Sequence, residues 1–195
     1  MKVKVGIDSA LIVVDVQKDF LPGGALPVPK GDEVIPVLNN YIKIFKEMRG
    51  RIFATRDWHP ANHVSFKGRG GPWPPHCIQG TEGAEFSGDL RLPGDTVIIS
   101  KATDPDVESY SGFGGTDLAE RLREDGVRRV FVGGLATEYC VKNTVLDAIE
   151  EGFETYFLED ASRGIELHPG DIEKAVAEMV RKGAVKISIS DIEKG

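Results

Sequence analysis

Cysteine is scarce in this sequence of 195 residues, which contains only Cys77 and Cys140. Two cysteines cannot build the framework of several disulfides that stabilises small secreted domains. No segment is a long, uninterrupted apolar run of the kind that spans a bilayer, and the N-terminus lacks the apolar stretch and cleavage site of a secretory signal. We therefore expect a cytoplasmic protein with no membrane partner.

An excess of positive charge is also missing. Lysine and arginine number 24 against 31 aspartates and glutamates, so the formal net charge is -7. Nucleic acids and anionic membranes bind basic patches, and this balance argues against both partners. Hydrophobic residues make up 41% and charged residues 28%, which is ordinary for a globular protein. The length and the absence of repeats predict a single domain over residues 1–195.

Strand-like and helix-like segments alternate along the chain. Strands are predicted at residues 10–14, 51–55, 96–100, 129–132, 154–158 and 185–188. Helices are predicted at 35–48, from a cap at Thr116 to about 124, around 140–149 and from about 169 to 182. This alternation indicates an α/β fold, with helical crossovers between parallel strands. We expect a three-layer α/β/α arrangement, doubly wound around a mainly parallel six-stranded sheet.

Residues 133–141 connect the strand at 129–132 to a helix, so Cys140 is predicted in the first helical turn. The free N–H groups and the dipole of a helix N-terminus favour an anion, which would lower the pKa of the thiol. Cys140 is therefore a candidate nucleophile. The alternative is a small buried core residue, the commoner role of a lone cysteine.

Polar residues follow several predicted strands. Asp15 ends the first strand, Asp57 and His59 follow the second, and Lys101 ends the third. Each has an ordinary interpretation, such as a turn cap or a solvated lysine. In an open parallel sheet, however, the carboxyl ends of the strands share one edge, where ligands bind. There a carboxylate could accept the proton of Cys140, and a lysine would favour the thiolate.

Histidines cluster in the long loop after the second strand. Asp57 and His59 are two residues apart and would point to one side of an extended segment, and His76 could reach them from the loop. One carboxylate and two imidazoles suit a single divalent metal ion, Zn²⁺, Fe²⁺ or Mn²⁺. His63 stays open between a metal ligand and a neighbour of the ligands. Cys77 is interpreted as a structural thiol.

Apolar residues outside the periodic segments could form a pocket. They are Phe20, Leu26, Trp73, Tyr110 and Leu135, all in predicted loops. Any of them could belong to the core, and the alternative is a wall against which a flat ring substrate stacks.

Six short segments carry a family resemblance: residues 11–20 (LIVVDVQKDF), 22–26 (PGGAL), 55–60 (TRDWHP), 73–77 (WPPHC), 100–101 (SK) and 136–141 (ATEYCV). In these the chain resembles the nicotinamidases (pyrazinamidases) of the isochorismatase-like cysteine hydrolase superfamily. The resemblance implies hydrolysis of nicotinamide, or of pyrazinamide, through a cysteine thioester, with a metal ion holding the pyridine ring in a step of NAD salvage. Alternatives are another small-amide hydrolase of this superfamily, or a metal-binding protein without turnover.

The resemblance also implies residue roles. Asp15, Lys101 and Cys140 match the catalytic triad of the family. Its metal ligands are matched by Asp57, His59 and His76, with a histidine at the position of His63 in some members. A cis peptide bond before Ala136 is implied, with the N–H groups of Ala136 and Cys140 as an oxyanion hole. Phe20, Trp73 and Tyr110 match positions of the substrate pocket. An exposed sheet edge or helix face could support a homo-oligomer.

Overall fold

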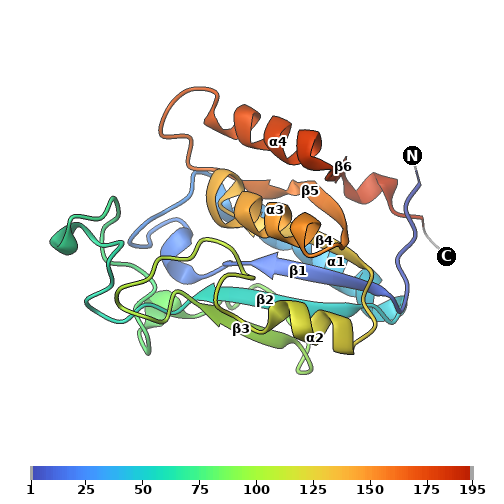
Figure 1. Cartoon of the computed structure of the whole chain (residues 1–195), viewed down its shortest axis with the longest axis horizontal. Helices are drawn as coiled ribbons and strands as arrows, with labels where there is room; N and C mark the ends of the chain where they lie inside the picture. The colour runs from blue at the N-terminus through green and yellow to red at the C-terminus, as the bar shows by residue number, and fades with distance from the viewer. Residues whose placement is uncertain (1, 194–195) are drawn as a thin grey trace.

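The computed structural model describes residues 2–193 and contains one six-stranded sheet (Figure 1). All strand pairs are parallel, in the order β3-β2-β1-β4-β5-β6. The strands are β1 (Ser9–Val14), β2 (Arg51–Asp57), β3 (Val97–Lys101), β4 (Arg129–Leu135), β5 (Glu154–Arg163) and β6 (Val185–Ile187). The predicted six-stranded α/β architecture is therefore confirmed, with a sheet that is wholly rather than mainly parallel.

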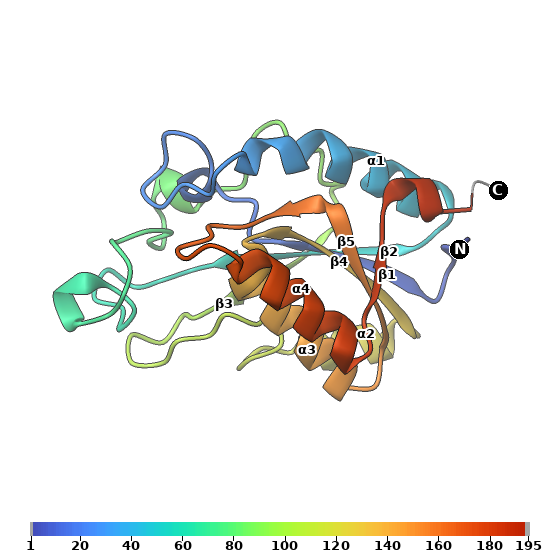
Figure 2. The same cartoon turned by 90° about the horizontal axis from the view of Figure 1, so that it is seen from above.

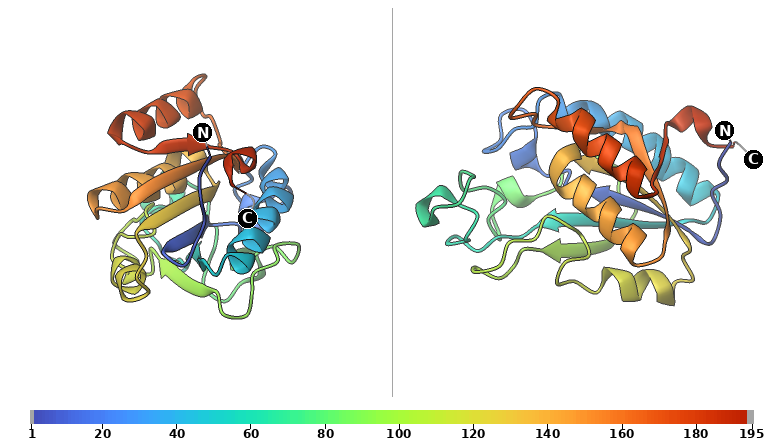
Figure 3. Two further views of the ribbon diagram at one scale, coloured as in Figure 1. Left: turned by 90° about the vertical axis from the view of Figure 1, so that its right-hand side faces the viewer. Right: turned by 45° about the horizontal axis from the view of Figure 1, so that its top comes forward.

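Helices cover both faces of the sheet and complete three layers (Figures 2 and 3). They are α1 (Val34–Glu47), α2 (Leu118–Glu124), α3 (Lys142–Glu150) and α4 (Asp171–Lys182). Along β1, Leu11 and Val13 pack in a core cluster with α1, whereas Ile12 and Val14 pack in a second cluster with the other three helices. This division follows from the alternation of side chains along a strand.

Strand β1 lies at the centre of the sheet, between β2 and β4, and every one of its residues is buried. From β1 the chain crosses over α1 to β2 on one side, whereas from β4 it crosses over α3 to β5 on the other side. The crossovers diverge between β1 and β4, which opens a crevice at the carboxyl ends of these strands.

The end of β4 approaches β1 so closely that only glycine fits at residue 134. A Cβ atom there would lie 2.2 Å from the carbonyl oxygen of Val14, and the φ angle of Gly134 is +132°. Strand β4 also continues to Leu135, beyond the predicted end at residue 132. Leu135 is thus a strand residue and not, as the sequence suggested, a loop residue.

Thr116 was predicted to cap the second helix, and its hydroxyl accepts a hydrogen bond from the N–H of Leu118, the first residue of α2, at 3.3 Å. Two other helices begin later than their sequence patterns predicted. The turn before α4 includes Gly170 with φ of +89°, a left-handed conformation that a helix cannot contain, and α4 starts at Asp171. Residues Thr137–Val141 form a π-helical turn, and α3 begins only at Lys142.

The segment between β2 and β3 contains only short 3₁₀ turns, yet it is anchored at defined points. Isolated bridges join His59 to Ile78 and Phe66 to Trp73. The segment extends from the carboxyl ends of the strands, as the green chain in Figure 1 shows. None of the helices within residues 2–193 has the length and hydrophobicity that a membrane crossing needs.

Replacing Leu38 by alanine should destabilise the fold. Leu38 lies on α1 with no exposed surface and packs in the core cluster on that face. Removing its buried side chain should lower the free energy of unfolding by about 2–5 kcal/mol in guanidinium denaturation. The matched control is Asn40→Ala on the exposed side of the same helix, which should change stability by less than about 0.5 kcal/mol. Equal effects of the two substitutions would contradict this assignment of the core.

Candidate active site

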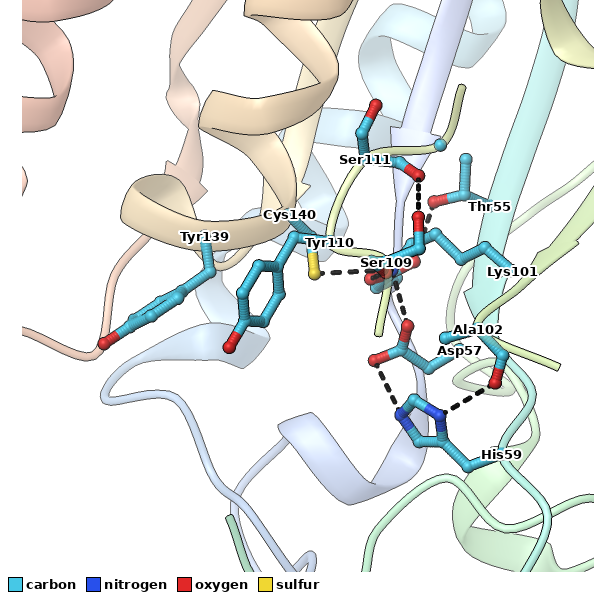
Figure 4. Close-up of polar contacts among 12 residues, drawn as sticks. Thr55, Asp57, His59, Lys101, Ala102, Ser109, Tyr110, Ser111, Tyr139 and Cys140 are labelled. Carbon is cyan, nitrogen blue, oxygen red and sulfur yellow. Dashed lines mark hydrogen bonds and ion pairs between the residues drawn. The ribbon is translucent and has the colours of Figure 1, made fainter. Parts of the chain in front are cut away.

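Lys101, the last residue of β3, places its ammonium group between two carboxylates. Its Nζ lies 2.9 Å from Oδ2 of Asp15 and 2.5 Å from Oδ1 of Asp57. The sulfur of Cys140 lies 3.4 Å from the same nitrogen (Figure 4). All four residues are buried, with Cys140 the most exposed at 6%. Side chains from the ends of β1, β2 and β3 and from the turn after β4 thus meet at one point.

Hydrogen bonds between neighbouring strand ends fix the carboxylate of Asp15 and the backbone of Asp57. The hydroxyl of Thr55 donates to Oδ1 of Asp15 at 2.7 Å. The buried amide of Gln17 accepts from the backbone N–H of Asp57 at 2.9 Å and donates to the carbonyl of the same residue at 2.8 Å. Gln17 was not among the predicted site residues, although it lies within the segment 11–20. Its amide pairs with the backbone as a neighbouring strand would, which orients Asp57.

Cys140 lies in the π-helical turn Thr137–Val141 and not in the first turn of an α-helix. Burial raises the pKa of the Cys140 thiol well above its usual value, and the charges of Asp15 and Asp57 add to the effect, although Lys101 opposes it. The expectation of a lowered pKa at a helix N-terminus is therefore wrong. A neutral thiol at this position needs a base to become a nucleophile.

Asp15 is placed to be that base. Burial raises the pKa of its carboxyl group, and the charge of Asp57 raises it further against the opposing effect of Lys101. Its Oδ2 atom forms an ion pair with Nζ of Lys101 at 2.9 Å. The carboxylate and the Cys140 sulfur lie within 4.8 Å of each other. The arrangement therefore places a carboxylate of raised pKa near a neutral thiol.

Lys101 remains charged at this site. Burial alone would lower its pKa, but the charges of Asp15 and Asp57 raise it well above the usual value. At Asp57, burial disfavours the anion, yet Lys101 and His59 together lower the pKa of the carboxyl group. A buried cation between buried anions compensates the desolvation that each would suffer alone.

Asp57 also faces two imidazoles. The Nε2 atoms of His59 and His76 lie 3.4 Å and 3.9 Å from its Oδ2 atom. The Nδ1 atoms contact the carbonyl oxygens of Ala102 at 3.1 Å and Pro74 at 2.7 Å, so Nδ1 carries the proton and Nε2 keeps a free lone pair. Histidines that bind metal ions donate their other ring N–H to a carbonyl oxygen in the same way. One atom from each of the three residues lies within 4.8 Å of the others, so they could hold one ion.

His63 is not part of this group of three. Its Nδ1 lies 2.7 Å from the hydroxyl of Ser65 and its Nε2 lies 3.0 Å from the carbonyl of Val107. Its ring stacks on that of His59, with centroids 4.1 Å apart. Both nitrogens thus have partners, and the stacking supports the ring of His59 from behind. Cys77 is fully buried, and burial raises the pKa of its thiol strongly.

One cavity is lined by both the thiol of Cys140 and the imidazole of His76. Its walls include Cys140, Asp57 and His76, together with Phe20, Leu26, Trp73, Tyr110, Ala136, Glu108, Tyr139 and Ile165. Trp73 donates its indole N–H to the hydroxyl of Tyr110 at 3.1 Å and meets the ring of Tyr139 edge-on at 5.1 Å. Leu135 is not among the lining residues, because its side chain is fully buried in the core cluster that contacts α1.

Three lining residues, Glu108, Tyr139 and Ile165, were not predicted. Tyr139 precedes Cys140 in the ATEYCV segment, which is a usable signal. Ile165 is held by Glu138, whose carboxylate accepts the backbone N–H groups of Ile165 at 3.0 Å and Glu166 at 2.9 Å. Nothing in the local sequence around Glu108 or Ile165 indicates a wall position. The peptide bond between Leu135 and Ala136 is cis.

The chain is similar to known proteins along almost its whole length. The isochorismatase domain model matches residues 9–191. The nicotinamidase of Escherichia coli K12 is 37% identical over 205 residues, covering 94% of this chain and 96% of that protein. The zinc-complexed pyrazinamidase of Pyrococcus horikoshii is 59% identical with a TM-score of 0.90, covering 93% of this chain and 99% of that one. PnC1 of L. infantum, in complex with nicotinate, is 36% identical with a TM-score of 0.92 and 99% coverage of both chains. The chain therefore belongs to the isochorismatase family.

Proposed function

We propose that this protein hydrolyses nicotinamide to nicotinate and ammonia, and that pyrazinamide is an alternative substrate. The observation that carries the proposal is a single cavity. Its wall holds the thiol of Cys140, the possible metal ligands Asp57 and His76, and several aromatic rings. A flat heteroaromatic amide needs each of these features. The similarity to nicotinamidases and a pyrazinamidase, over more than nine-tenths of the chain, supports the same substrate class.

Asp57, His59 and His76 are proposed to hold one divalent metal ion. The donor set fits, because two imidazoles with free Nε2 lone pairs and one carboxylate oxygen converge on one point. Zinc is the first candidate, since the P. horikoshii relative is a zinc complex, and iron and manganese suit the same ligands. When bound, the ion would supply a Lewis-acid position for the ring nitrogen of a pyridine.

The first half of the reaction forms a thioester. Asp15 takes the proton of the Cys140 thiol, and the thiolate attacks the carboxamide carbon. The backbone N–H groups of Ala136 and Cys140 donate to the oxyanion that develops, and such a donor typically contributes about 3–4 kcal/mol. Asp15 then gives its proton to the leaving nitrogen, which departs as ammonia while the acyl group stays on the sulfur.

The second half removes the acyl group with water. Asp15, again ionised, takes a proton from water as the oxygen attacks the thioester carbon. The carbon–sulfur bond then breaks, the proton on Asp15 returns to the thiolate of Cys140, and the product leaves as nicotinic acid, whose proton passes to the released ammonia to give nicotinate and ammonium. Throughout, Lys101 contacts both carboxylates and the sulfur, so its fixed positive charge offsets the negative charge that moves among them. Trp73 and Phe20 form part of the cavity wall against which the pyridine ring of the substrate lies.

Replacing Cys140 by alanine should abolish ammonia release from nicotinamide, because no other thiol lines the cavity within residues 2–193. The expected fall in kcat is at least about ten-thousand-fold. Nicotinamide should still bind to the metal-loaded variant, as measured by calorimetry, because the aromatic wall and the metal ligands are unchanged.

The matched control for this substitution is Cys77→Ala, which removes a buried thiol outside the cavity wall and should keep turnover near that of the wild type. Activity in the Cys140 variant would remove the nucleophile assignment. If the metal-loaded wild-type protein released no ammonia from nicotinamide, the substrate proposal would fail, and other small amides would be screened.

Replacing His76 by alanine should release the metal, since it removes one of three converging ligands. Mutating a residue that only hydrogen-bonds to a metal ligand typically weakens metal binding about 10- to 100-fold. Removing a ligand itself should therefore weaken metal binding by more than this. Metal content after dialysis, measured by mass spectrometry, provides the test. The control is His63→Ala, which should retain metal because both ring nitrogens of His63 contact other groups. Equal loss in both variants would place His63 among the ligands.

A further inference from the structure

A groove of about 820 Å³ lies outside the active site, between α4 and the sheet edge formed by β6. Helix α4 is the outermost element on its side of the molecule, as Figure 3 shows. Ala175 and Met179 bury one side of the helix against the protein. The groove side carries the apolar residues Ile172, Val176 and Val180, and Val180 is 46% exposed.

Beside this apolar row runs a second row with the same spacing of four residues: Glu173, Ala177 and Arg181. Glu173 and Arg181 lie eight residues apart, which is about 12 Å along a helix. Neither has an ion-pair partner within the described residues, although neighbouring charges on the same surface do, as in the pairs Lys142–Glu178 and Lys186–Glu159. The row therefore has a negative end, a small centre and a positive end.

This pattern is complementary to itself. If a second copy of α4 lies antiparallel with a twofold axis at Ala177, Glu173 faces the partner's Arg181, and Arg181 faces the partner's Glu173. The small side chain of Ala177 at the axis lets the two helices approach closely, and the apolar row packs beside it. A twofold interface uses the same surface on both subunits, so one row supplies both ion pairs.

We propose that two copies of this chain form a twofold dimer through the groove face of α4. The edge of β6 is a poor alternative surface. It has only three residues, Val185–Ile187, and its central Lys186 is paired with Glu159 at 3.0 Å. Short edge strands with charged side chains resist strand pairing. The helix face therefore makes the contact, and no residue of α4 lines the catalytic cavity.

Charge reversal tests this dimer. Sedimentation velocity of the wild-type protein should give twice the chain mass of 21.2 kDa at micromolar concentration. Glu173→Arg and Arg181→Glu should each weaken dimerisation at least about tenfold, because each places like charges opposite each other at both ends of the interface. The double variant, E173R with R181E, should restore the dimer, since the charges are exchanged and the pairs re-form.

The control is Glu120→Arg on the exposed surface of α2, which makes the same charge change far from the groove and should leave the dimer intact. Circular dichroism confirms that each variant is folded. The proposal is overturned if the wild-type chain is monomeric up to about 100 μM, if the single reversals leave the dimer intact, or if the double variant stays as weak as the single ones.

Discussion

The buried ammonium group of Lys101 holds three strands and two carboxylates together at one point. Asp15 directly follows β1, Asp57 ends β2 and Lys101 ends β3, so the ion pairs lock the carboxyl ends of adjacent strands. Removing one partner from such a buried group leaves an uncompensated charge, which costs about 3–5 kcal/mol. Burial and the charges of Asp15 and Asp57 also raise the pKa of the Cys140 thiol, although Lys101 opposes them, so the thiol is neutral.

Asp57 links the two halves of the site through its two oxygens. One oxygen contacts Lys101, and the other faces His59 and His76. Cys140 and the two imidazoles are therefore connected through Lys101 and a single carboxylate, that of Asp57, whose backbone is clamped by Gln17.

The residues that meet at the strand ends could be predicted because parallel strands deliver their last residues to a common edge. The order of secondary structure elements was equally accessible, since periodicity is a local property of the sequence. The pKa of Cys140 could not be predicted in this way, because it depends on burial and on carboxylates that follow or end other strands. Leu135 was misplaced since glycines at 133 and 134 read as a turn, although close approach to β1 requires Gly134 within the strand. Glu108 and Ile165 lie in irregular segments without periodicity.

Trp73 stands in the cavity wall, bonded to Tyr110, and is one of two tryptophans in the chain. The other, Trp58, has the guanidinium of Arg56 stacked 3.7 Å from its ring centroid and is not a wall residue. A ring that enters the cavity changes the surroundings of one indole and leaves the other as it was. The protein thus contains a fluorescent reporter of occupancy and an internal reference for it, without any label.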